Sequence, residues 1–130
     1  MTGVVVAVDV GLRYSGVAVS NPEGTLALPL EVIDERNPAR RLARLASIVR
    51  EREAREVIVG RPVSLRGSRI ELTYVAEHFA ATLQVATERP VRLVDERLSS
   101  VAAARTAGRG QRVDAAAAAL FLQTYLDRRG

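Results

Sequence analysis

The chain has 130 residues and a net charge of +4; 48% of its residues are hydrophobic and 26% are charged. This length fits one compact domain, and the composition argues against a disordered chain. Because the chain has no cysteine, disulfides and thiolate metal sites are excluded. The single histidine, His78, argues against a histidine-based zinc site and a Ser-His-Asp triad. Any metal must therefore be held by carboxylates, which select hard ions such as Mg²⁺ or Mn²⁺.

All 19 basic residues are arginines. One interpretation is genome composition, since GC-rich codons favour arginine and alanine, and the chain is rich in both. The other is a phosphate-binding surface, because guanidinium groups donate paired hydrogen bonds to phosphate oxygens. The two interpretations are compatible, so the charge gives a modest preference for a nucleic-acid partner.

Nothing in the sequence indicates membrane association or export. No segment reaches the roughly 18 apolar residues that a membrane span needs. The amino terminus, Met1–Val4, has no basic region before its apolar run, so it is more typical of a strand than of a signal peptide. We therefore expect a cytoplasmic protein without a membrane partner.

The first part of the chain predicts three strands joined by hairpins. The apolar, β-branched run Val4–Val8 predicts a buried strand that Asp9 closes. Gly16–Ser20 predicts the second strand, and the alternating segment Thr25–Ile33 predicts a half-buried third strand. Pro29 cannot donate a ladder hydrogen bond, which makes the third strand an edge strand. The residues expected to share its apolar face are Leu26, Leu28, Leu30 and Val32.

The rest of the chain alternates between helices and strands. Asn37 and Pro38 predict a helix start, and this helix runs to about Arg52 with one apolar stripe and its arginines elsewhere. The stripe consists of Leu42, Leu45, Ile48 and Val49. The further elements expected are a strand at Glu56–Gly60, a helix at Ser68–Thr87, a strand at Pro90–Val94, a short helix from Ser99 or Ser100 to about Gly108, and a helix at Val113–Arg128.

This order of elements predicts the fold class. Three antiparallel strands followed by strand–helix alternation give an α/β protein with a mixed five-stranded sheet and helices on both faces. The strand–helix order resembles that of the ribonuclease H-like fold.

Acidic residues fall at the predicted ends of these elements, where sites form in open α/β sheets. Asp9 ends the first strand, Asp95 and Glu96 follow the fifth, and Asp114 lies in the first turn of the last helix. Each has a simpler interpretation as a turn residue, a solvated charge or a favourable charge at a helix start. Asp9 and Asp114, however, interrupt apolar runs, and buried carboxylates are costly unless they are paired or bind cations. Converging carboxylates would hold divalent ions for phosphodiester hydrolysis.

Four segments resemble the sequence blocks of the RuvX/YqgF family, in order and over nearly the whole chain. They are AVDVGLRYSGVAVS, VIVGRPVSLRGS, VDERLSSVAA and VDAAAAALFLQTYLD. The resemblance implies one nuclease domain over residues 1–130, with Asp9, Glu96 and Asp114 as the catalytic, metal-binding set. It implies an endonuclease that acts in 5′ maturation of pre-16S ribosomal RNA, or a Holliday junction resolvase of recombination and repair.

Strand alternation separates the two adjacent acids of the third block. In an extended fifth strand, Asp95 shares a face with Leu93, whereas Glu96 shares the other face with Arg92. The Asp95 face is the more apolar, so we expect Asp95 to bond local backbone donors. Glu96 is therefore the expected third ligand, with Asp95 as the alternative.

Arginines near the expected site are candidate phosphate contacts. They are Arg13, Arg61, Arg109 and Arg112. Where the family usually has Lys-Arg, this chain has Arg13-Tyr14, which keeps one charge and replaces the other by an aromatic ring. Arg61 adds a cation where the family usually has leucine.

Two other functions compete with a nuclease. A non-catalytic nucleic-acid-binding module on the same fold would keep the arginines and lose the carboxylates, which this chain retains. An actin-like ATPase also has Asp-x-Gly on a hairpin, but it needs two such domains, and 130 residues provide one. The choice between ribosomal RNA and branched DNA stays open from the sequence, as does the oligomeric state, including a homodimer.

Overall fold

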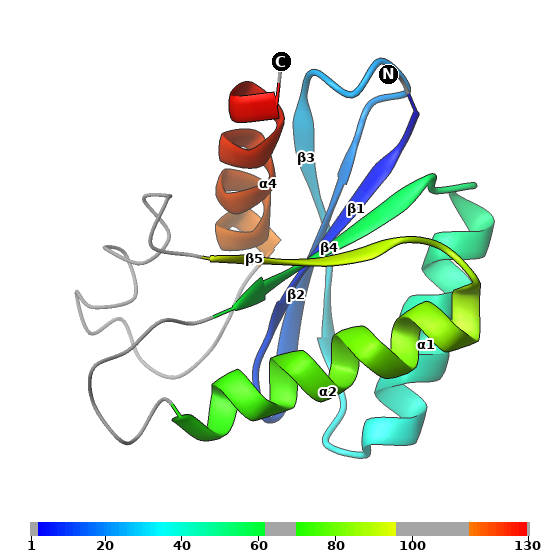
Figure 1. The fold of residues 1–130 in the computed structure, drawn as a ribbon, viewed down its shortest axis with the longest axis vertical. Helices are drawn as coiled ribbons and strands as arrows, with labels where there is room; N and C mark the ends of the chain where they lie inside the picture. Colours follow the sequence, from blue (N-terminus) through cyan, green and yellow to red (C-terminus); the bar gives the residue numbers. More distant parts are fainter. Residues whose placement is uncertain (1–2, 62–69, 96–114, 130) are drawn as a thin grey trace.

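A five-stranded sheet lies between two layers of helices (Figure 1). The computed structural model describes residues 3–61, 70–95 and 115–129. The strands are β1 (Val5–Val10), β2 (Tyr14–Ser20), β3 (Ala27–Asp34), β4 (Glu56–Arg61) and β5 (Val91–Asp95). The helices are α1 (Pro38–Glu51), α2 (Ile70–Thr87) and α4 (Ala115–Arg129). These elements confirm the predicted order, while the short helix expected to end near Gly108 lies outside the described residues. None of the three helices is long and apolar enough to span a membrane.

The sheet is mixed, as the hairpins followed by strand–helix alternation predict. Its strand order is β3-β2-β1-β4-β5. β2 pairs antiparallel with both β1 and β3, whereas β4 pairs parallel with both β1 and β5. Because β1, β4 and β5 run in the same direction, their carboxyl ends lie at one edge of the sheet. We call this the carboxyl edge.

Alternate residues of β1 contact different helical layers. Val6 and Val8 belong to a core cluster with residues of α1 and α2, and Val5 and Ala7 belong to a second cluster with residues of α4. Every residue of β1 is buried because helices cover both faces of the sheet (Figure 1). The predicted helices on both faces are therefore confirmed.

Strand β3 departs from the alternation that its sequence predicts. The register between β2 and β3 shifts at a β-bulge, where Leu30 is the extra residue. An extra residue reverses the alternation, so Leu28 and Val32 lie on opposite faces and the predicted shared apolar face is wrong. Ile33 is the residue of β3 that is buried in the core. The position of β3 at the edge of the sheet, predicted from Pro29, is confirmed.

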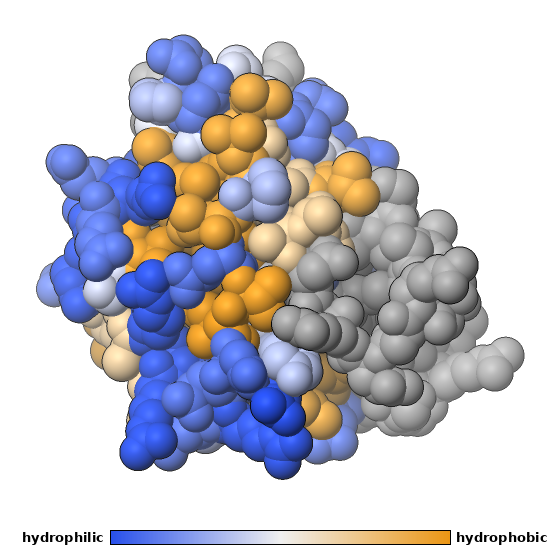
Figure 2. Space-filling view, turned by 180° about the vertical axis from the view of Figure 1, so that it is seen from behind, coloured by the Kyte–Doolittle hydropathy of each residue, from blue (hydrophilic) through white to orange (hydrophobic). Residues whose placement is uncertain are grey.

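Part of the apolar surface stays exposed to solvent. Leu26 and Leu28, before and within the edge strand β3, are 52% and 48% exposed. Seen from behind, hydrophobic residues gather over the middle of the molecule, with hydrophilic residues on one side and below (Figure 2). Pro29 lacks a backbone N–H, which makes β3 a poor template for pairing with another strand.

Helix α1 begins where its sequence predicts. Asn37 Oδ1 accepts hydrogen bonds from the backbone N–H groups of Ala39 and Arg40, at 2.9 and 3.2 Å. The prediction that all its arginines lie off the apolar stripe is wrong for Arg41, which is 5% exposed. Arg41 lies one helical turn before the buried Leu45, so helical periodicity itself directs its side chain inward.

Helices α1 and α2 both end at a glutamate in the left-handed conformation. After α1, Glu53 N–H donates to Arg50 O at 3.1 Å and Ala54 N–H donates to Val49 O at 3.0 Å, which is a Schellman motif. The φ angle of Glu53 is 51°, and that of Glu88, which follows α2, is 56°. Glycine is the usual residue at this position because it has no Cβ to clash.

Candidate functional site

Asp9 is a buried carboxylate on the central strand. The prediction that it ends this strand is wrong by one residue, because β1 continues to Val10, which pairs with Ser15. Its side chain lies on the face covered by α4, since Ala7, two residues earlier, packs in the cluster with this helix. Asp9 is 1% exposed. A carboxylate at this depth is costly unless a polar partner or a cation compensates for its lost hydration.

Glycines lie beside Asp9 on both neighbouring strands. Gly16 of β2 is its antiparallel partner. In β4, Val59 pairs with Val8, and continuing this register by one residue sets Gly60 beside Asp9. Because glycine has no side chain, neither neighbouring strand adds bulk next to the carboxylate on the α4 face. This arrangement suits the close approach of a ligand.

Asp95 lies on the opposite face of the sheet from Asp9. It is the last residue of β5 and pairs with Arg61 of β4. Arg61 Nε lies 3.8 Å from Glu77 Oε2 of α2, so this pair lies on the face covered by α1 and α2. Val94, one residue before Asp95, packs in the α4 cluster, as strand alternation requires. The sheet therefore separates Asp95 from Asp9.

Several predicted site residues lie outside the described residues. They are Glu96, Arg109, Arg112 and Asp114. Within the described residues, no group of three or more Asp, Glu or His side chains is placed to hold a metal ion. Of the predicted set of Asp9, Glu96 and Asp114, the structure thus places Asp9.

Helix α4 runs against the direction of β1. Near its end, Arg129 Nη1 lies 2.5 Å from Oε1 of Glu56, the first residue of β4. Tyr125 donates a hydrogen bond to the same carboxylate oxygen at 3.2 Å. The last turns of α4 therefore lie at the edge where β4 begins. Its first turn, from Ala115, lies toward the carboxyl edge (Figure 1).

Arg13 lies between β1 and β2 at the carboxyl edge, and it is paired with Asp34. Arg13 Nε donates to Asp34 Oδ1 at 2.7 Å, and Nη2 donates to Oδ2 at 3.4 Å. The guanidinium also lies over the ring of Tyr14, 4.9 Å from its centre. The hydrogen bond to Asp34, and then its negative charge, raise the pKa of Arg13. From the sequence, Asp34 is interpreted as part of a solvated loop after the edge strand, because only the register of β2 and β3 brings it to Arg13.

Arg61 provides a second cation at the carboxyl edge. It is the last residue of β4, and half of its side chain is exposed. Its contact with Glu77, at 3.8 Å, is long for a hydrogen-bonded ion pair. Arg61 can therefore turn toward an anion at this edge at little cost.

Arg41 is a buried cation that sequence reasoning missed. Its Nη1 donates hydrogen bonds to the carbonyl oxygens of Gly11 (3.0 Å) and Leu12 (3.3 Å). Its guanidinium lies 5.7 Å from the centre of the Phe79 ring of α2. Burial lowers the pKa of Arg41. The residue joins α1 to the loop that follows β1, and so holds the backbone between Asp9 and Arg13.

Comparison with known proteins finds similarity over nearly the whole chain. A model of the family described as "RuvX: Holliday junction resolvase" matches residues 3–128. The "Putative pre-16S rRNA nuclease" of Chloroflexus aurantiacus is 39% identical over 134 residues, which cover 97% of this chain and 88% of that protein. The protein of the same name from Rhodococcus erythropolis is 47% identical over 137 residues, which cover 95% and 77%.

Solved structures show the same fold. The structure described as "T. thermophilus RuvC in complex with Holliday junction substrate" matches with a TM-score of 0.64. It covers 98% of this chain and 96% of that chain at 18% identity. At this identity the likeness concerns the fold alone, and it confirms the expected ribonuclease H-like fold.

Proposed function

This chain belongs to the RuvX family, and we propose that it is an endonuclease whose carboxylates bind Mg²⁺ or Mn²⁺ for phosphodiester hydrolysis. Family membership and the names of its relatives support a nuclease. The observation that carries the proposal is the buried Asp9 on the central strand, with Gly16 and Gly60 beside it.

The chemistry of the available donors fits a hard divalent cation. Asp9 offers carboxylate oxygens, the chain has no cysteine, and its one histidine, His78, is exposed on α2. We propose Glu96 and Asp114 as the two further ligands. When bound, such an ion would activate water and stabilise the charge that develops on the leaving oxygen.

The two faces of the sheet favour Glu96 over Asp95 as the third carboxylate. Asp95 lies on the α2 side, opposite to Asp9. An extended backbone would turn the next side chain, Glu96, to the face of Val94, which is the face of Asp9. Asp114 directly precedes α4, whose first turn lies toward the carboxyl edge on that same face.

We propose precursor 16S ribosomal RNA as the substrate, cleaved during 5′-end processing in the cytoplasm. Support comes from relatives of 39% and 47% identity that are named for this activity. Arg13 and Arg61 at the carboxyl edge are proposed phosphate contacts, together with Arg109 and Arg112. The second candidate substrate is a Holliday junction, because the matching family is described as a resolvase. A homodimer stays a prediction for either substrate.

A cleavage assay with both substrates tests the proposal. Wild-type protein is given a pre-16S ribosomal RNA or a four-way DNA junction, with Mg²⁺, with Mn²⁺ and with excess chelator. Asp9→Asn should abolish cleavage while the melting temperature stays the same or rises, because the variant removes a buried negative charge. The matched control is Asp127→Asn, which changes an exposed aspartate near the far end of α4 and should keep full activity.

The same assay separates the two adjacent acids. Glu96→Gln should lose turnover with the fold intact, whereas Asp95→Asn should retain it. Cleavage by Asp9→Asn, or cleavage in excess chelator, would remove the metal mechanism. Cleavage of the junction in preference to the RNA would select the second candidate substrate.

A further inference from the structure

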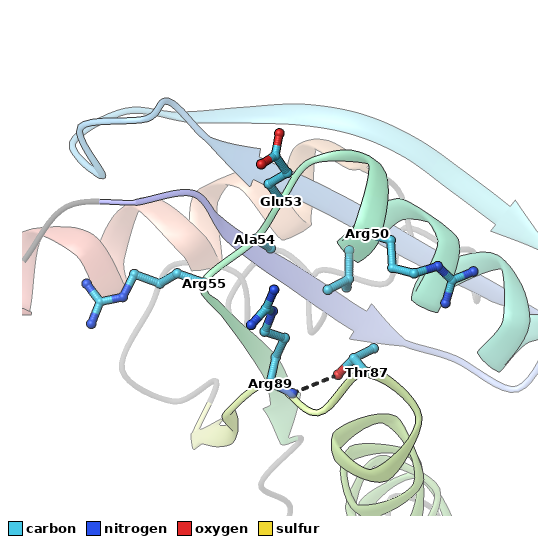
Figure 3. A pocket seen from close by; sticks show the side chains of 7 residues that line it. Arg50, Glu53, Ala54, Arg55, Thr87 and Arg89 are labelled. Carbon is cyan, nitrogen blue, oxygen red and sulfur yellow. Dashed lines mark hydrogen bonds between the residues drawn. The ribbon is translucent and has the colours of Figure 1, made fainter.

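A pocket of about 350 Å³ lies at the edge of the sheet opposite the carboxyl edge (Figure 3). It forms where the chain passes from α1 into β4 and from α2 into β5. Three arginines, Arg50, Arg55 and Arg89, line it together with Glu53. The lining thus has a formal excess of positive charge.

The three guanidinium groups are spread along the pocket. Arg89 lies between Arg50 and Arg55, whose guanidinium groups extend to opposite sides, and the carboxylate of Glu53 points away from Arg89 (Figure 3). Arg50 and Arg89 are exposed, and neither forms a salt bridge with any other described residue. Their positive charge therefore faces solvent without a neutralising carboxylate from the described parts of the chain.

Two further arginines near the pocket form salt bridges with one carboxylate. Arg129 and Arg92 both contact the buried Glu56, at 2.5 and 3.6 Å. A single buried carboxylate thus pairs with two nearby cations, and neither of them is Arg50 or Arg89. The pocket is therefore a local concentration of positive charge within a partly neutralised edge.

Helix dipoles account for only part of this charge. A cation at a helix carboxyl end is stabilised by about 0.3–1 kcal/mol, which explains Arg50 in the last turn of α1. Arg55 lies outside the helix, beyond its Schellman motif. The residues at the two helix ends themselves, Glu53 and Glu88, carry the charge that the dipole disfavours. A ligand for the arginines explains the pattern better than helix stabilisation does.

We propose that this pocket binds the phosphate backbone of the nucleic-acid substrate, away from the proposed cleavage site. The proposal rests on the proposed function. Guanidinium groups that extend in different directions match successive phosphates along a strand, whereas a single small anion needs donors that converge on it. The ligand is accordingly a polyanionic strand rather than a free phosphate.

The strand geometry sets the length of substrate that reaches both sites. Arg55 precedes β4 and Arg61 ends it, and a strand of 6 residues spans roughly 20 Å. B-form DNA rises about 3.4 Å per base pair, so this distance corresponds to about six base pairs, and an A-form RNA helix needs slightly more base pairs to span it. Between them, on the outer strand β5, the side chain of Arg92 is 66% exposed. A helix of the substrate that lies along β5 would contact the carboxyl edge and the pocket together.

Binding of substrates with different arm lengths tests the proposal. Fluorescence anisotropy in excess chelator measures the affinity of the full chain for structured RNA with an arm of about 4 or about 12 base pairs. Arg89→Ala should weaken binding of the long arm and leave binding of the short arm unchanged. The matched control is Arg44→Ala, which removes one charge from the side of α1 that contacts Glu31 of β3, and it should leave both affinities unchanged.

The salt dependence identifies the contact as a phosphate. Loss of one phosphate contact lowers the slope of log K against log salt by about 0.9. The advantage of the wild type over Arg89→Ala on the long arm should therefore shrink roughly 3.5-fold between about 50 and about 200 mM salt. Melting temperatures of the variants establish that each is folded.

Three results would overturn the proposal: equal binding of the long arm by wild type and Arg89→Ala, equal weakening on both arms, or a wild-type advantage that does not depend on salt. Each would leave the proposed function intact if the wild type cleaves and Asp9→Asn does not. Conversely, arm-length-dependent binding by a protein that cleaves neither substrate would support the pocket and refute the nuclease.

Discussion

Replacing Glu53 by glycine should stabilise the protein. Glu53 is the left-handed residue of the Schellman motif after α1, with a φ angle of 51°. A side chain in this conformation costs about 1–2 kcal/mol, because Cβ approaches the following carbonyl oxygen. Glycine removes that cost and keeps both hydrogen bonds of the motif, which involve only the backbone.

The expected gain is the strain that is removed minus the entropy that glycine adds to the unfolded chain. The added entropy offsets about 0.4–1 kcal/mol, which leaves a net stabilisation of about 0.5–1 kcal/mol. For a chain of 130 residues, 1 kcal/mol raises the melting temperature by about 4 °C. Removing a carboxylate from the helix carboxyl end adds a further 0.3–1 kcal/mol or so.

Urea denaturation and thermal melting of Glu53→Gly and Glu53→Ala separate the two contributions. Both variants remove the carboxylate, but alanine retains the Cβ, so the difference between them measures the backbone strain minus the entropy that glycine adds to the unfolded chain. Glu53→Gly should unfold at higher urea than Glu53→Ala, with an unchanged m-value. The same pair of substitutions at Glu88 provides an independent repeat. Equal stability of the glycine and alanine variants at both positions would refute the strain argument.

Three further predictions concern stability. Phe121→Ala should lower the free energy of unfolding by about 3–5 kcal/mol in urea, because Phe121 is 1% exposed between α4 and the sheet; a loss below about 1 kcal/mol would contradict this packing. Arg41→Lys should cost about 1–3 kcal/mol, because the shorter donor leaves the buried carbonyl oxygen of Gly11 and the partly buried one of Leu12 unsatisfied; an unchanged urea midpoint would exclude this role. Burial, and then the negative charge of a neighbouring carboxylate, raise the pKa of Tyr125. The free energy of unfolding should therefore fall as the pH rises above about 10, and Tyr125→Phe should make this fall with pH less steep. An identical pH dependence of the two proteins would contradict the raised pKa.

Local signals were sufficient to predict most of the fold. Asn37 caps α1 because its side chain bonds the N–H groups that every helix start leaves unpaired. Gly24 lies in the turn between β2 and β3 with a φ angle of 71°, a conformation that glycine adopts without a steric cost. The apolar β-branched run of β1 predicts a strand buried on both faces, which the helical layers confirm. Such features depend on a few adjacent residues, so sequence alone reveals them.

Features that depend on cross-strand register could not be predicted. The continuous apolar run ends at Val8, which led to the prediction that Asp9 closes the strand, but hydrogen bonding to β2 extends the strand to Val10. The bulge at Leu30 is set by how β3 pairs with β2, and the neighbouring Pro29 is compatible with a plain edge strand as well as with a bulge. The ion pair between Arg13 and Asp34 likewise depends on that register. The order of strands and helices was enough to predict that the site lies at the carboxyl edge of the sheet, but it was not enough to predict which side chains pair there.

The burial of Arg41 was within reach of the sequence. It lies one turn before Leu45 and therefore on the apolar side of α1. A rule that assigns every arginine to the surface overlooks this spacing. The physical reason for its burial lies in another element, where the carbonyl oxygens of the β1–β2 loop need a donor.

Among the helices of the described residues, α4 alone packs on the Asp9 face, and this has a consequence for the order of folding during synthesis. Residues of α1 and α2 can cover one face of the sheet as soon as they leave the ribosome, whereas the described helix that covers the other face is made of residues 115–129. Until then Ala7, Ala18 and Ile58 face water, and Asp9 stays hydrated. The layer with the proposed catalytic carboxylate is thus completed last, and a growing chain passes through a state in which the sheet is covered on one face. Pauses in translation would prolong this state, and chaperones would recognise its exposed apolar face.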